Sequence, residues 1–205
     1  MKNIAPTKAN LLKVKDNLKL SKVGYNLIDK KRTVLIKEMM QQIEKAKKVQ
    51  NDLKVMFEQA YKMLQEANIT MGVMEVQDVS YGMDTSENFD ISYKSVMGLD
   101  VPRVKYTVKE DKTPNYSMHM TNEYVDKAIV EFEKIKYLVY QLAETENTVY
   151  KLSIEIKKNQ KRANALDKIQ IPDLSETVKY ISATLEEKDR EDFFRLKIIK
   201  KRKQQ

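Results

Sequence analysis

The segment AKKVQNDLKVMFEQAYKMLQEA, from Ala46 to Ala67, repeats small or apolar residues at alternating intervals of three and four. A seven-residue repeat of this kind predicts a helix that supercoils around a partner helix. The same stripe reaches back toward the N-terminus with few polar interruptions, through Leu11, Val14, Leu18, Ser21, Tyr25, Ile28, Arg32, Leu35, Met39 and Gln42. We therefore expect one helix of roughly 90 Å, which must bury its stripe against another helix.

The last third of the chain supplies a second stripe of similar length. It is predicted at Val125, Ala128, Phe132, Ile135, Val139, Leu142, Glu146, Val149, Ser153, Ile156, Gln160 and Ala163, and it resumes at Leu174, Val178, Ile181, Leu185, Phe193 and Leu196. The simplest arrangement is an antiparallel pair in which each helix covers the stripe of the other. The predicted fold is mainly α, a long antiparallel two-helix coiled-coil hairpin.

A proline interrupts the second helix in KRANALDKIQIPDLSETVKYI, residues 161–181. Pro172 has no backbone N–H to donate, and it disfavours helical conformation at Ile171. We predict a helix break at Ile171-Pro172, with Ser175 as the cap of the restarted helix. Two interpretations remain open: the break bends the second helix, or it is passive and keeps the heptads from drifting out of register.

The middle segment, residues 71–118, differs in composition from both helices. It contains three of the four glycines of the chain and three stretches that read as strands, MGVMEVQDVSY, FDISYKSVM and RVKYTVK. We predict a small β-hairpin, or a few short strands, at the tip of the coiled coil. The predicted organisation is an N-terminal coiled-coil helix (1–70), a tip segment (71–118) and a C-terminal coiled-coil helix (119–205) with its break near 171–172.

The composition favours long helices and indicates the cellular compartment in which the protein works. Charged residues make up 33% of the chain, and it has only 4 Gly and 4 Pro, so helix breakers are rare. The absence of Cys fits a reducing compartment, and the longest apolar run is too short to cross a bilayer. We expect a cytoplasmic protein. The net charge of +8 is concentrated at the two ends of the chain, which favours an anionic partner there.

Catalytic patterns are not found in the sequence. His119 is the single histidine, and there is no Gly-rich phosphate loop. Glu186, Glu187 and Asp189 lie among Lys188 and Arg190, where pairs three or four residues apart stabilise a helix. We expect no catalytic residue, metal site or cofactor.

Both ends of the chain carry a longer pattern. Near the C-terminus it reads KRANAL at 161–166, IP-x-L-x-x-TV-x-YI at 171–181 and LEE-x-x-RE-x-FFRLK-x-x-K at 185–200; near the N-terminus it reads PTK at 6–8, G-x-x-LI at 24–28 and KR at 31–32. The pattern resembles the D subunit of the vacuolar-type and archaeal-type rotary ATPases over nearly the whole chain. Asp29 and Thr33 depart from the family pattern.

The resemblance implies the role of a central-stalk rotor, one copy per complex, that transmits torque between a catalytic hexamer of A and B subunits and a membrane ring moving protons or sodium ions. It also implies contacts with the F subunit and with a membrane-side collar subunit (C or d), a location peripheral to the membrane without insertion into it, and no nucleic acid. The residues it suggests for contact with the hexamer are Lys8, Lys31, Arg32, Arg190, Phe193, Phe194, Arg195, Lys197 and Lys200. The alternatives are a non-motor coiled-coil scaffold and a nucleic-acid-binding protein.

Overall fold

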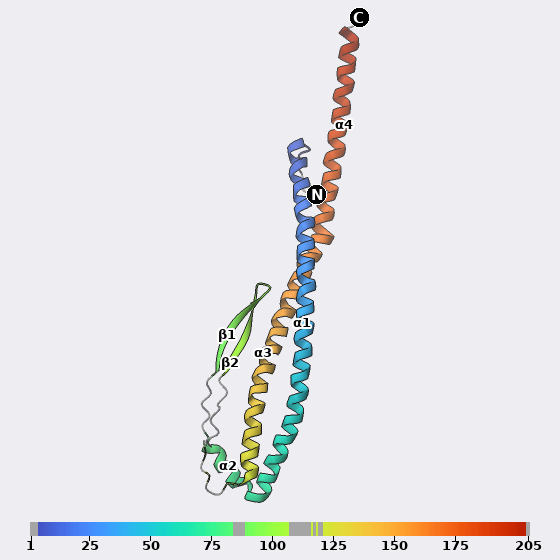
Figure 1. Cartoon of the computed structure of the whole chain (residues 1–205). Coiled ribbons are helices and arrows are strands. Elements are labelled where there is room, and N and C mark those ends of the chain that lie inside the picture. The colour runs from blue at the N-terminus through green and yellow to red at the C-terminus, as the bar shows by residue number, and fades with distance from the viewer. Residues whose placement is uncertain (1–3, 84–88, 107–115, 117, 119–120, 204–205) are drawn as a thin grey trace. The chain divides into compact units, whose positions relative to one another are not determined.

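The structure is a computed structural model that describes residues 4–83, 89–106, 116, 118 and 121–203. Its elements, in chain order, are α1 (Lys8–Met71), α2 (Val73–Tyr81), β1 (Phe89–Val96), β2 (Leu99–Tyr106), α3 (Glu123–Ala165), the π-helix η1 (Leu166–Gln170) and α4 (Ile171–Lys203) (Figure 1). The prediction of a mainly α fold with a small β-hairpin in the middle of the chain is confirmed. The chain divides into unit 1, Met1–Val34 with Glu155–Gln205, and unit 2, Leu35–Ile154.

Within each unit, α1 lies antiparallel to the helix that returns. In unit 2, the Gln50 side chain donates to Glu146, and the Asn122 side chain donates to Thr70. Between these bonds lies a buried cluster of Leu53, Ala60 and Ile135, against which Val49, Met56, Phe57, Phe132, Leu138 and Leu142 pack. In unit 1, Gln170 donates to Ser21, and Lys8 pairs with Asp189.

The heptad stripe of α1 is confirmed along its whole length. Every predicted position from Leu11 to Ala67 is buried or half-buried, including the polar Ser21, Arg32 and Gln42. Small residues allow the two helices to approach closely where Ala60 and Ala67 are fully covered.

The predicted stripe of α3 is wrong at Val139 and Glu146, which are exposed. Leu138 is half-buried in place of Val139, and Leu152, fully buried, takes the facing position predicted for Ser153. The regular spacing alternates three and four residues, but here two steps of three follow one another, from Phe132 to Ile135 and from Ile135 to Leu138. The buried position therefore falls one residue earlier than predicted, at Leu138 instead of Val139. Such an irregularity in the repeat locally overwinds a coiled coil.

The predicted helix break is also wrong, because the helix continues through Ile171-Pro172. The five residues before them form a π-helix, in which the backbone N–H of Ile171 donates to the carbonyl of Leu166. Ile171 has α-helical dihedral angles of −65° and −47°. Ser175 lies inside α4, so no restarted helix exists for it to cap.

The π-helix corrects the phase of the apolar stripe. A π-turn holds one residue more than an α-turn, so Leu174, Val178 and Leu185 are half-buried while Ile181 is fully buried. If the α-helix continued without a π-turn, apolar positions spaced three and four residues apart from Leu166 onward would include Tyr180. Tyr180 is instead 62% exposed. The interpretation in which this site maintains register is therefore supported, and a bend at this site stays a prediction.

The strands β1 and β2 form an antiparallel hairpin with Phe89 opposite Tyr106 and Val96 opposite Leu99. Its two-residue turn, Met97-Gly98, has positive φ at both positions, 54° and 78°. This conformation matches the twist of the flanking strands, and glycine is the residue that adopts it most readily. FDISYKSVM and the first part of RVKYTVK are thus strands as predicted, while Thr107, Val108 and Lys109 lie outside the described residues.

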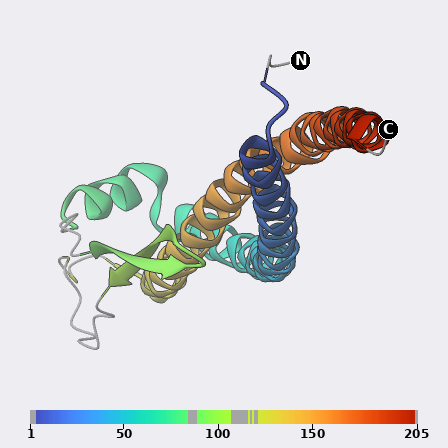
Figure 2. The same cartoon turned by 90° about the horizontal axis from the view of Figure 1, so that it is seen from above.

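Two predictions for the middle segment are wrong. MGVMEVQDVSY is not a strand: Met71 ends α1, Gly72 separates the helices with a φ of 102°, and the remainder forms α2. Val76 and Val79, three residues apart, form the half-buried face of α2, a spacing typical of a helix. The hairpin does not lie at the tip of the helix pair. It lies along the side of α3, as two views show (Figures 1 and 2).

Candidate interaction surfaces

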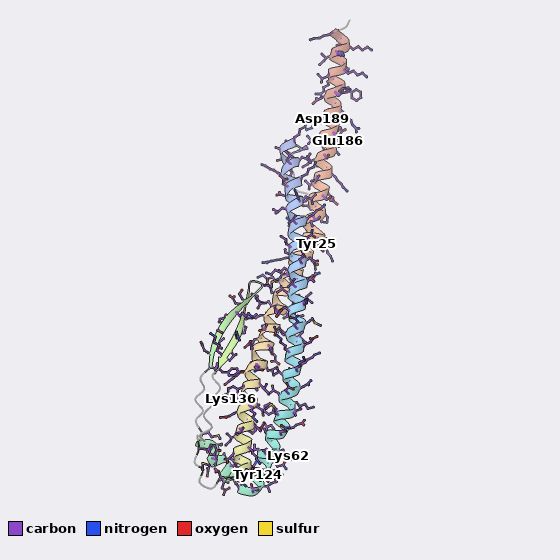
Figure 3. All side chains as sticks on the ribbon, viewed as in Figure 1. Tyr25, Lys62, Tyr124, Lys136, Glu186 and Asp189 are labelled. Atoms are coloured by element: carbon purple, nitrogen blue, oxygen red, sulfur yellow. The ribbon has the colours of Figure 1, made fainter. Side chains whose placement is uncertain are left out.

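The C-terminal part of α4 continues past the beginning of α1. The ion pair between Lys8 Nζ and Asp189 Oδ1, at 3.5 Å, joins the first turn of α1 to α4, and Figure 3 shows Glu186 and Asp189 at this level. Every residue from Glu186 to Lys203 is exposed. We call residues 190–203 the α4 end.

The α4 end combines exposed apolar and basic side chains. Phe193, Phe194, Leu196, Ile198 and Ile199 are each more than half exposed. The last turn carries Lys200, Lys201, Arg202 and Lys203. Large apolar side chains in such a concentration mark a surface that a partner covers.

Six of the nine predicted contact residues lie together on the α4 end: Arg190, Phe193, Phe194, Arg195, Lys197 and Lys200. Arg195 lies within 3.8 Å of both Glu191 and Asp192 on the same helix. These pairs are exposed and weak, so the guanidinium can exchange them for another carboxylate at small cost. Lys8, also exposed, lies on α1 near the same level through its pair with Asp189.

Arg32 does not belong to this exposed group. It lies on the buried stripe of α1, where its guanidinium donates to Gln160 Oε1 of α3 and pairs with Asp29 Oδ1 at 2.6 Å. Asp29, which departs from the family pattern, thus supplies a local partner for Arg32. Lys31 is half-buried beside it. The structure therefore separates Lys31 and Arg32 from the α4 end.

A second surface, which sequence reasoning missed, lies where the hairpin contacts α3. The Tyr106 ring stacks on Tyr137 with 5.0 Å between centroids, and it also contacts Tyr140, against which Phe89 lies at 5.7 Å. The recurrence of Tyr137 and Tyr140 three residues apart is the signal that could have revealed this contact, because such residues share one helix face.

Three polar contacts anchor the hairpin to α3. The backbone N–H of Val104 donates to Glu144 Oε2 at 3.0 Å, Gln141 donates to the hydroxyl of Tyr106, and Lys151 Nζ donates to the carbonyl of Asp100. Lys151 also lies 5.1 Å from the centroid of the Tyr93 ring, a favourable cation–π geometry. The apolar side chains of Phe89, Ile91 and Tyr93 on β1 stay about half exposed or more.

Within the described residues, no three His, Asp or Glu side chains lie where they could hold a metal ion. No described helix is apolar enough over a sufficient length to cross a membrane. His119 lies outside the described residues. Tyr116 has a large pKa change: burial and the hydrogen bond to Asp126 raise the pKa of its hydroxyl to about 12.

Comparisons with known proteins match one protein family over nearly the whole chain. A family model described as the ATP synthase D subunit matches residues 10–201. The V-type ATP synthase D subunit of Thermotoga neapolitana is 42% identical over 200 residues, which cover 98% of each chain. The A-type ATP synthase D subunit of Pyrococcus abyssi is 34% identical over 199 residues, covering 96% of this chain and 93% of that one. The corresponding protein of Methanobrevibacter smithii is 38% identical over 200 residues, covering 96% and 86%.

Proposed function

Because this chain belongs to the family of ATP synthase D subunits, we propose that it is the non-catalytic rotor shaft of a V/A-type rotary ATPase. It transmits torque between the catalytic hexamer of A and B subunits and the membrane ring, and so couples ATP hydrolysis or synthesis to the transport of protons or sodium ions. Its further partners are the F subunit and the membrane-side collar subunit. One copy acts in each complex, on the cytoplasmic side of the membrane.

The observation that carries this proposal is the exposed α4 end. A shaft that turns inside a hexamer needs a surface that is covered in the complex yet forms no deep, fixed pocket. A single helix with large apolar side chains on an exposed surface and a basic last turn has these properties. Its positive charge favours a cavity lined with carboxylates, since electrostatic attraction acts without close fit.

The paired helices support the mechanical part of the proposal. In unit 2, α1 and α3 are joined by the Leu53–Ala60–Ile135 cluster, and in unit 1, the N-terminal half of α1 is covered by the returning helix as far as Leu185. Two helices locked by interdigitating side chains resist twisting better than one helix. The angle of the shaft and the nucleotide state of the hexamer are then linked reciprocally.

The test is purification of the complex through a tag on this chain, followed by native mass spectrometry. We expect a hexamer of nucleotide-binding subunits with one copy of this chain. A quadruple variant with Arg195, Lys197, Lys200 and Lys201 each changed to Glu should recover less hexamer, and the remaining binding should lose its sensitivity to salt.

A matched control makes the same four charge reversals at exposed lysines of α1 in unit 2, namely Lys47, Lys48, Lys54 and Lys62. This control should recover the hexamer as the unmodified chain does. Full recovery with the α4-end variant, at unchanged salt sensitivity, would contradict the proposed role of the charges. A homodimer without nucleotide-binding subunits would support the alternative of a non-motor scaffold. Co-purified nucleic acid would support the alternative of a nucleic-acid-binding protein.

A further inference from the structure

A polar layer interrupts the buried stripe of the helix pair in unit 1. Arg32 occupies a stripe position of α1, and Asn159 of α3 is a polar residue that is only 2% exposed. Arg32 Nη1 donates to Gln160 Oε1, the residue next to Asn159, and its Nη2 pairs with Asp29. The layer therefore joins α1 to α3 through side chains of both helices.

This layer is not arranged for maximal stability. The Arg32 Nε–H and the Asn159 Nδ2–H are buried, and neither has a protein acceptor among the described residues. Burying a donor without an acceptor destabilises the folded state. Replacing buried polar groups by well-packed apolar side chains often stabilises a protein, so another benefit must account for the layer.

The apolar stripes specify the register of the two helices only weakly. Both consist largely of Ala, Leu, Val, Ile and Met at seven-residue intervals, so a shift of one heptad leaves apolar side chains facing apolar side chains. The polar layer distinguishes these registers. After such a shift, Asn159 would face the level of Tyr25 or Met39 instead of Arg32, and Arg32 would lose Gln160.

We propose that Arg32, Asn159 and Gln160 form a register lock, a polar layer that selects one alignment of α1 with the returning helix in unit 1 at the expense of stability. A second, partly buried bond supports the same alignment: Gln170 Nε2 donates to Ser21 Oγ at 3.2 Å, and Ser21 is 7% exposed. Single buried polar residues select register in this way in other coiled coils.

The register lock deepens the proposed function, because a shaft under torque must not let its helices slide past one another. It rests on the geometry of the chain itself, however, and its test needs no other protein of the complex. The lock can therefore fail while the rotor role stands, and the rotor role can fail while the lock stands.

The experiment measures register in the full-length chain by pulsed electron–electron resonance. The chain contains no Cys, so spin labels can be placed without background at Lys13→Cys on α1 and Lys179→Cys on α4, both exposed. The labelled chain should give one distance. In the same background, Arg32→Leu/Asn159→Leu/Gln160→Leu should give two or more distances, displaced along the helix axis by about 10 Å for one heptad.

Thermal unfolding followed by circular dichroism accompanies each measurement. The triple variant should melt at the same temperature as the unmodified chain or higher. Loss of its fold would overturn the proposal, because the layer would then supply stability instead of register. A single unshifted distance in the folded triple variant would overturn it equally. The single variant Asn159→Leu, which keeps the Arg32–Gln160 bond, should broaden the distribution less.

The matched control is Gln50→Leu, which removes the exposed cross-helix bond to Glu146 in unit 2. It should keep one distance, because an exposed bond exchanges with water at little cost. A split distribution in this control would also contradict the proposal, since any cross-helix bond would then fix the register and the buried layer would have no special part.

Discussion

Ile181 and Tyr180 are neighbours in α4 with opposite environments: Ile181 is fully buried, and Tyr180 is 62% exposed. The difference follows from the extra residue of the π-helix, which turns Ile181 toward α1. We predict that Ile181→Ala lowers the free energy of unfolding by about 2–5 kcal/mol, through lost burial and the cavity left behind. Tyr180→Ala should change it by roughly 0.5 kcal/mol or less. Urea denaturation of the two variants measures both values, and equal losses would refute the assigned helix phase.

Tyr116 gives a prediction about pH. Its hydroxyl donates to Asp126 Oδ1 at 2.6 Å, and burial together with this bond raises its pKa from 10.0 to about 12. The folded state therefore holds the proton more tightly than the unfolded state. The resulting stability is fully present below pH 10 and is lost as the pH rises toward 12.

The Asp126→Asn variant tests the cause of this change. It removes the carboxylate charge and weakens the hydrogen bond, so the pKa of Tyr116 should fall back toward 10.0. Carbon-13 NMR of the labelled tyrosine ring, assigned with Tyr116→Phe, measures the titration of this one residue among the tyrosines. A pKa of Tyr116 that stays near 12 in Asp126→Asn would show that burial and the charge of Glu133 raise it without Asp126.

At the scale of elements, the sequence predicted long helices well and local irregularities poorly. The α1 stripe was predictable because each of its buried positions lies at a spacing of three or four from the next. In α3, Leu138 and Val139 are both apolar, so the pattern allowed either, and only packing against α1 selects Leu138. The π-helix could not be predicted, because Pro172 is compatible with a break or with a wider turn, and the partner helix decides between them.

The π-helix gives a prediction that uses a double-mutant cycle. Deleting Lys168 converts the wide turn to an ordinary α-turn and keeps the apolar stripe in phase. It also places Pro172 in a regular helix, where its ring clashes with a carbonyl of the preceding turn at a cost of about 3 kcal/mol. The deletion alone should therefore destabilise the chain by roughly that amount, as measured by thermal and urea unfolding.

Pro172→Ala in the deletion background should restore most of this loss, while Pro172→Ala alone should change stability little. The two changes would then be strongly non-additive. A harmless deletion, or a double variant as unstable as the deletion alone, would show that the π-helix does not serve to accommodate the proline.

The hairpin gives a prediction confined to one element. Tyr140 contacts both Phe89 and Tyr106, and each aromatic pair contributes about 0.5–1.5 kcal/mol. Tyr140→Ala should therefore lower the hydrogen-exchange protection of residues 89–106 several-fold and leave the helix pair protected. Tyr150→Ala, which removes a tyrosine that is 65% exposed on the same helix, is the control and should change neither. Equal loss of protection in α1 would indicate that the hairpin supports the helices.

At the scale of the whole molecule, we expect the α4 end to matter for assembly with the hexamer and not for the stability of the folded chain. No residue beyond Leu185 is buried or half-buried in the described part of the chain, and the Lys8–Asp189 pair is exposed. Removing residues 190–205 should thus change the free energy of unfolding by less than about 1 kcal/mol. The same truncation should abolish recovery of the hexamer in the tag purification. Loss of the fold on truncation, or full recovery of the hexamer, would contradict this separation.

For the candidate site residues too, some features could be inferred from the sequence and others only from the folded structure. The α4 end could be singled out from the sequence because it carries a long pattern of apolar and basic residues that no partner stripe explains. Its exposure agrees with this choice, and its contact with the hexamer stays a prediction. Arg32 was assigned to the same surface because sequence alone does not distinguish a charged side chain on a stripe from one beside it. Its hydrogen bond to Gln160, far away in the chain, places Arg32 between the two helices and is visible only after folding. A contact of Arg32 with the hexamer stays a prediction.

The position of the hairpin on one side of α3 has a consequence for imaging. Two parallel rods look nearly the same after half a turn about their common axis, so a blurred density map leaves their azimuth ambiguous. The hairpin makes the outline of unit 2 lopsided and removes that ambiguity (Figure 2). In the rotor that we propose, this ridge marks the rotation angle of the shaft. Electron cryomicroscopy of the assembled complex should therefore assign an angle to each particle from the ridge even where side chains are not visible.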